Sequence, residues 1–134
     1  MKVEGKISTF GGPDDKGVSP SEGLALLNLS DVIVPQFRPL FLPKQPAGTC
    51  GLARRLNPNA FYLAMRWDYA QTPRAFLRKI KVTCIANGIQ VEAQPVDWGP
   101  HMRTGRVADL SPGLARALKL QTDDRATFIV PDFR

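Results

Sequence analysis

The densest group of chemically active side chains lies between residues 97 and 112. Two carboxylic acids, Asp97 and Asp109, share this window with Trp98, Arg106 and His101, which is the only histidine of the chain. Carboxyl groups suit general acid–base chemistry, provided that burial or a neighbouring negative charge raises the pKa of the group that must donate a proton. We therefore expect the functional site in this window.

The residues between and after the two acids predict a loop that joins two strands, followed by a short helix. Gly99-Pro100 must end a strand, because Pro100 lacks an N–H group and Gly99 permits a positive φ, and residues 106–108 can resume an extended run. Ser111 and Pro112 are typical of a helix N-cap and of the first helical residue. The elements thus place both acids beside a loop.

Asp109 lies just before the predicted helix, and two effects compete for its proton. The unpaired N–H groups and the dipole of a helix start favour the carboxylate anion. Burial favours the neutral acid instead. The pKa of Asp109 depends on which effect is larger.

The composition predicts a single, mainly β domain over residues 1–134. With 43% hydrophobic residues, the chain can bury a core without disulfides or a metal ion. Twelve prolines and eleven glycines without a period indicate many turns. Such a chain favours a barrel or sandwich with short helices over a helical bundle.

The net charge of +6 suits an anionic partner, which could be nucleic acid, a membrane surface or a polymer bearing carboxylates. No aromatic-basic motif accompanies the charge, so we do not expect a nucleic-acid partner. His101 has no second histidine or paired cysteine for a metal site, and we expect no cofactor. Cys50 and Cys84 could form one bridge or stay free. No apolar run reaches the length of a membrane span or forms a leader.

Alternation and turn residues predict the other elements. Asn87-Gly88 separates two alternating runs, which is typical of a hairpin. Asp14 and Asp15 follow a first strand in a glycine-rich loop. The predicted strands are 5–10, 61–69 with one apolar face, 80–84, 89–93 and 125–130. Short helices are predicted to begin at Ser19 and at Thr72. Residues 28–50 are predicted to be extended and irregular.

Several of these segments resemble the rare lipoprotein A family and the related expansins. The resemblance is carried by Asp97-Trp98-Gly99-Pro100, by the run from Gly105 to Ser111, by the small apolar helix 114–120, by the hairpin and by the opening strand 6–12. It covers residues 5–27 and 78–130. It implies a six-stranded double-psi β-barrel with short helices, interrupted by an atypical Pro-rich insertion at about 28–77.

The resemblance also implies an activity on cell-wall glycan. A lytic transglycosylase or glycoside hydrolase of this kind needs a carboxylic acid that protonates the leaving oxygen, and Asp109 matches that position. A hydrolase needs a second carboxyl group, for which Asp97 or, from the first loop, Asp14 or Asp15 are the candidates. The partner would be peptidoglycan. The protein would be a monomer outside the cytoplasm, exported by a leader that is then removed or by another release route. Its substrate-binding residues would be Trp98, His101, Arg106 and Asp14.

A second hypothesis is a non-catalytic module, which binds glycan or presents a loop to a protein partner as protease inhibitors do. The tyrosine that follows the first strand in the family is absent here, and the residues near 24–27 lack its histidine. Asp97 and Asp109 would then accept backbone N–H bonds in the crossing loops.

Overall fold

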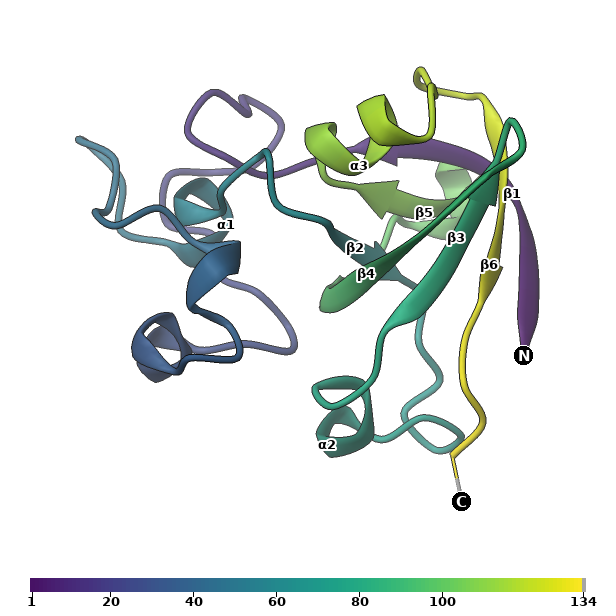
Figure 1. The fold of residues 1–134 in the computed structure, drawn as a ribbon. Helices are drawn as coiled ribbons and strands as arrows, with labels where there is room; N and C mark the ends of the chain where they lie inside the picture. The colour runs from purple at the N-terminus through teal and green to yellow at the C-terminus, as the bar shows by residue number, and fades with distance from the viewer. Residues whose placement is uncertain (134) are drawn as a thin grey trace.

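The chain folds mainly as β-structure, with six strands closed into a barrel (Figure 1). The computed structural model describes residues 1–133. The order around the barrel is β1-β5-β2-β4-β3-β6. The strands are β1 (Lys2–Thr9), β2 (Tyr62–Met65), β3 (Val82–Ala86), β4 (Ile89–Trp98), β5 (Arg106–Leu110) and β6 (Arg125–Ile129).

The barrel has an internal pseudo-symmetry. Strands β1 and β5 pair in parallel, as do β2 and β4, and all other neighbours are antiparallel. Exchanging β1 with β4, β2 with β5 and β3 with β6 leaves the order of strands unchanged. The barrel therefore consists of two similar halves, β1–β3 and β4–β6.

Most of the predicted strands and turns are confirmed. The hairpin β3–β4 turns at Asn87 and Gly88, whose φ values of 54° and 74° are those of a tight hairpin turn. Ser111 caps helix α3 (Pro112–Ala117) through a 3.1 Å bond from the N–H of Leu114. The helical turn after Thr72 forms α2 (Arg74–Leu77).

The strand predicted over residues 61–69 is shorter than expected and buried on both faces. Leu63 and Met65 point into the barrel core, whereas Tyr62 and Ala64 belong to a second core outside the barrel. A period-two pattern predicts burial of one face only. The burial of the second face could not be predicted, because the residues that pack on it come from a segment that is distant in the sequence. Residues 28–77, expected as an insertion, thus include a barrel strand.

The chain between β1 and β2, residues 10–61, forms a lobe of irregular structure beside the barrel (Figure 1). The outer core lies under this lobe. Its largest fully buried members from the lobe are Phe37 and Leu56. Within the lobe, the structure has two 3-10 helices, η1 (Leu29–Ile33) and η2 (Arg38–Leu40), and one helical turn, α1 (Leu52–Arg55). The expectation of an irregular segment is therefore confirmed apart from these turns.

No helix follows Ser19, which corrects the prediction of a capped helix there. The side chain of Glu22 does accept a bond from the N–H of Ser19 at 3.4 Å. However, the backbone at Pro20 and Glu22 accepts bonds from residues 50–53, and the N–H of Leu26 bonds to β4. A backbone committed to these partners cannot form a helical ladder.

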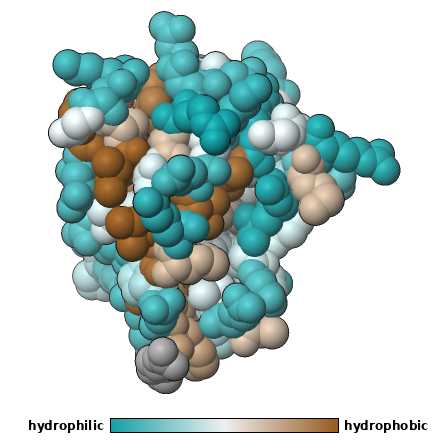
Figure 2. Space-filling model, turned by 90° about the vertical axis from the view of Figure 1, so that its right-hand side faces the viewer, coloured by the Kyte–Doolittle hydropathy of each residue, from teal (hydrophilic) through white to brown (hydrophobic). Residues whose placement is uncertain are grey.

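The opposite side of the barrel carries no such lobe. Strands β1 and β6 alternate buried and exposed residues, as strands with one solvated face do. Figure 2 shows this side, where hydrophilic residues predominate around a smaller hydrophobic area. Cys50 is exposed and Cys84 is buried, and both are free thiols. In the described residues 1–133, every helix is too short or too polar to cross a bilayer.

Candidate functional site

Two acids lie on one row of residues that crosses four strands. On β5, Asp109 pairs with Ser8 of β1 on one side and with Ala64 of β2 on the other. Ala64 pairs in turn with Asp97 of β4. Since directly paired residues share a face of a sheet, both carboxyl groups face the outside of the barrel. Two strand spacings correspond to about 10 Å between the backbones of the two acids.

A groove of about 290 Å³ opens over the two acids of this row. It brings together five of the residues predicted from sequence: Asp109, Asp97, Asp15, Trp98 and His101. The remaining lining comes from the end of β1, the following loop and the loop after β4, namely Thr9, Phe10, Gly17, Val18, Glu22, Gly99 and Pro100.

Asp109 is half-buried and bonded through one carboxylate oxygen. The hydroxyl of Ser8 donates to its Oδ1. Its other oxygen, Oδ2, faces the loop after β4, because a Cβ built on Gly99 would lie 4.0 Å from it. The N-cap of α3 is Ser111, so the helix start does not use Asp109 as its cap.

Burial raises the pKa of Asp109 above its ordinary value. The hydrogen bond from Ser8 and the charge of Arg106 act in the opposite direction, and the negative charge of Asp15 adds to the rise. Burial is the largest of these influences, and the start of the helix is not among them. A carboxyl group in this state keeps its proton to a higher pH and can donate it.

Asp97 has a structural bond pattern as well as a shifted pKa. Its Oδ1 accepts the N–H of Ala25 at 2.8 Å and that of Trp98 at 2.9 Å. Burial nevertheless raises its pKa, against these two bonds and with a contribution from Glu22 and Asp109. Asp97 thus anchors the lobe to β4 and remains a titratable group in the groove.

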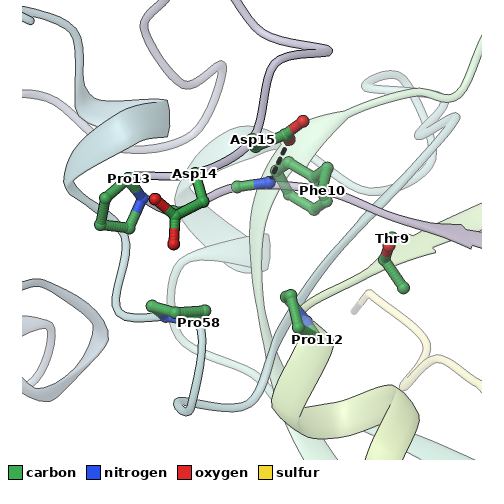
Figure 3. A pocket seen from close by; sticks show the side chains of 9 residues that line it. Thr9, Phe10, Pro13, Asp14, Asp15, Pro58 and Pro112 are labelled. Atoms are coloured by element: carbon green, nitrogen blue, oxygen red, sulfur yellow. Dashed lines mark hydrogen bonds between the residues drawn. The ribbon is translucent and has the colours of Figure 1, made fainter.

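The first loop supplies the other acids. Asp15 is held by bonds from the N–H groups of Gly11 at 2.6 Å and Gly17 at 2.8 Å. Asp14 lines a second hollow of about 320 Å³, whose walls include three proline rings (Figure 3). Thr9, Phe10 and Asp15 line both hollows, so the two are neighbours.

Trp98, at the end of β4, and His101, in the loop that follows, border the groove. Trp98 is 43% exposed, and its indole N–H donates to the backbone carbonyl of Trp67 at 3.1 Å, which fixes the ring. His101 is exposed, and its Nδ1 accepts the N–H of Arg103 at 3.1 Å. A fixed, partly exposed aromatic ring beside a groove can stack on the apolar face of a ligand.

Arg106, which is predicted to bind substrate, does not line either hollow. Its Nε donates to Asp123 at 2.9 Å in an exposed ion pair. The side chain therefore acts on the site only through its charge, which lowers the pKa of Asp109.

Sequence reasoning missed Ser8 and assigned Glu22 only a capping role. Alternation along the first strand places Ser8 on the polar face, but its partner depends on a parallel register between strands far apart in sequence. Glu22 reaches the groove because its segment forms no helix. Residues 1–133 contain no cluster of three or more His, Cys, Asp or Glu side chains that could hold a metal ion.

Comparison with known proteins identifies no family: no protein-family model matches the chain, and no curated protein is detectably similar to it in sequence.

Proposed function

We propose that this protein is a double-psi β-barrel that binds a β-linked glycan, peptidoglycan in the first place, and cleaves it with Asp109 as the proton donor. The observation that carries the proposal is the pair Asp109 and Asp97, which lie two strands apart in one groove, each with a raised pKa. Glycoside hydrolases hold their two carboxyl groups roughly 5 to 10 Å apart, and the backbones of Asp97 and Asp109 are about 10 Å apart.

The strand pairing supports the double-psi assignment. Each of the two parallel pairs, β1–β5 and β2–β4, joins a strand of one half to a strand of the other. When the halves are exchanged, the connection 10–61 takes the place of the connection 99–105. Two equivalent crossing connections are what gives a double-psi barrel its name. The groove lies where these connections meet the ends of β1 and β4.

The chemistry needs one proton donor and one acceptor. Asp109 gives its proton to the glycosidic oxygen as the bond to the anomeric carbon breaks. In a lytic transglycosylase, the sugar's own 6-hydroxyl oxygen forms the new bond to that carbon and loses its proton to the ionised carboxylate of Asp97. In a hydrolase, water takes the place of that hydroxyl. Trp98 would stack on a sugar ring beside the reacting bond.

Digestion of purified sacculi tests the proposal. The parent protein should release sugars with anhydro or reducing ends, and Asp109→Asn should release at least about 100-fold less. Glu4→Gln is the matched control, because Glu4 is an exposed acid on the outer face of β1, paired with Lys2. Absence of released sugars with the parent protein, or full activity of Asp109→Asn, would contradict the proposal.

The second candidate is a non-catalytic glycan-binding module. It is favoured by the two backbone bonds that Asp97 accepts, because they give this acid a structural task. In that case Trp98→Ala should weaken retention of the protein on sacculi, Asp109→Asn should retain it fully, and no turnover should be detectable. Turnover that depends on Asp109 would exclude this candidate.

A further inference from the structure

A third hollow lies on the lobe, away from the acidic groove. It has a volume of about 260 Å³ and a largely apolar lining. The only charged residues that line it are two arginines, Arg38 and Arg55. The apolar lining comes from Val32, Ile33, Phe41, Leu42 and Pro43.

Two large apolar side chains of η1 are exposed, and one of them, Ile33, also lines this hollow. Leu29 is 68% exposed and Ile33 is 75% exposed. Between them, Asp31 is buried and forms an ion pair with Arg78 at 2.7 Å, which fixes the helix to the rest of the molecule. Among the described residues, Ile33, Met102 and Leu29 are the most exposed large apolar side chains, and two of these three belong to η1.

The two arginines are fixed at the hollow but keep free donors. Arg38 donates one N–H to the carbonyl of Ile33 at 3.2 Å. Arg55 donates two, to Leu42 at 3.1 Å and Pro43 at 2.8 Å. A guanidinium has five N–H groups, so both retain donors for an anion. In the part of the chain that the structure describes, neither has an ion-pair partner.

The charge around this surface has one sign. From residue 32 to residue 67 the sequence contains no Asp or Glu, and its five basic residues include both arginines. Asp31, which precedes this stretch, is neutralised by Arg78. The hollow itself is lined by two arginines and no acidic side chain, next to exposed apolar groups.

We infer that this surface docks on an anionic phospholipid bilayer, with Leu29 and Ile33 inserted among the lipids and with Arg38 and Arg55 bound to lipid phosphates. Exposed apolar side chains next to basic groups suit the interface of a bilayer. Arginine matches phosphate through paired N–H bonds, and basic residues are attracted to anionic leaflets. The inference is independent of the proposed glycan activity.

Vesicle sedimentation with the full chain tests this inference. The protein should bind vesicles of phosphatidylglycerol mixed equally with phosphatidylcholine, and bind phosphatidylcholine vesicles at least about tenfold less. The double variants Leu29→Ser/Ile33→Ser and Arg38→Gln/Arg55→Gln should each weaken binding to the mixed vesicles about tenfold or more. Thermal melts should show that both variants stay folded, since the replaced side chains include none from the fully buried core.

The matched control is Met102→Ser/Arg103→Gln in the loop after β4, where Met102 is 70% exposed and Arg103 follows it. This variant removes an equally exposed apolar group and a cation from another face, and it should bind the mixed vesicles like the parent protein. Equal binding to both kinds of vesicle, or equal loss in the control and in the lobe variants, would overturn the inference.

Insertion can be read directly with an environment-sensitive fluorophore. Ile33→Cys in a Cys50→Ser background leaves one reactive thiol, because the remaining Cys84 is buried. A label on this residue should shift to the blue on mixed vesicles. A label on Met102→Cys in the same background should not. No shift at position 33 would contradict insertion even if the protein sediments with vesicles.

Discussion

The two halves of the barrel have the same strand arrangement and different chemistry. In the row over which the groove opens, the first half supplies Ser8 and Ala64, whereas the second half supplies Asp97 and Asp109 at the corresponding places. Both acids thus come from one half, and the other half contributes a hydroxyl that bonds to Asp109. The symmetry of the backbone determines where a site can form, and the side chains of one half determine what it can do.

The corresponding connections differ as much as the strands do. Connection 10–61 covers the outer face of β2 with a second core, and it also supplies Asp15 and Glu22 to the groove. Connection 99–105 is short and leaves Trp98 partly exposed. A groove results because one connection forms a wall and the other leaves an opening.

The largest effect should come from removing a buried aromatic ring from the lobe. Phe37 is 2% exposed in the outer core, so Phe37→Ala should lower the free energy of unfolding by about 3–5 kcal/mol. Because the outer core packs directly on β2, the loss should appear in one cooperative transition in chemical denaturation. Phe128→Ala in the barrel core is the matched comparison. A separate early transition for Phe37→Ala alone would show that the lobe unfolds independently.

A somewhat smaller loss is expected from the ion pair that fixes the lobe. Arg78→Ala should cost about 3 kcal/mol, at the low end for a buried pair, since the arginine is partly exposed. The hydrogen bonds from Arg78 lower the pKa of Asp31. The stability from the pair is therefore present above the ordinary carboxyl pKa, and it is lost as the pH falls through the lowered pKa.

Denaturation of Arg78→Ala at neutral and acidic pH measures this dependence. Arg106→Ala, which breaks an exposed pair in the barrel, should have a much smaller effect. An equal loss of stability in both variants would contradict the stabilising role of the Asp31–Arg78 pair. A loss for Arg78→Ala that grows in acid would also contradict it.

The short connection is expected to be sensitive at Gly99. This residue has a φ of 137°, so Gly99→Ala should destabilise the fold by about 1–2 kcal/mol. The added methyl group would also lie near Asp109 Oδ2 and reduce any glycan cleavage. Gly23→Ala is the control, because Gly23 has open space and no positive φ. Melting temperatures that fall equally in both variants would refute the argument.

The smallest expected effect on stability concerns Asp109 itself. Its raised pKa means that the folded state favours the neutral acid, so this stability is present at low pH and lost as the pH rises through the raised pKa. At neutral pH, Asp109→Asn should therefore melt at the same temperature as the parent or slightly higher. A clear destabilisation would indicate that Asp109 is a structural residue.

Local chemistry was sufficient to predict the second half of the barrel. Asn87-Gly88 can form only a tight turn, Gly99-Pro100 ends a strand, and Ser111-Pro112 starts a helix, and each of these features depends on neighbouring residues alone. The first half could not be predicted equally well. The burial of β2 and the loss of the helix after Ser19 depend on bonds and packing between segments far apart in sequence.

The same division applies to the candidate site. Asp97, Trp98, His101 and Asp109 are close in sequence, and the structure also places them around one groove. Arg106 belongs to the same window but turns away to Asp123, which a motif cannot reveal. Ser8 enters the site only through the register of two parallel strands.

The most direct test of the account is a titration of the Asp109 carboxyl carbon by NMR, in the parent protein and in Asp15→Asn. The account predicts that Asp109 titrates above the ordinary value of 3.8, because burial and neighbouring negative charge favour its neutral form. It also predicts a lower pKa in Asp15→Asn, since that variant removes one of those charges. A pKa at or below 3.8 in the parent protein would contradict the assignment of Asp109 as a proton donor.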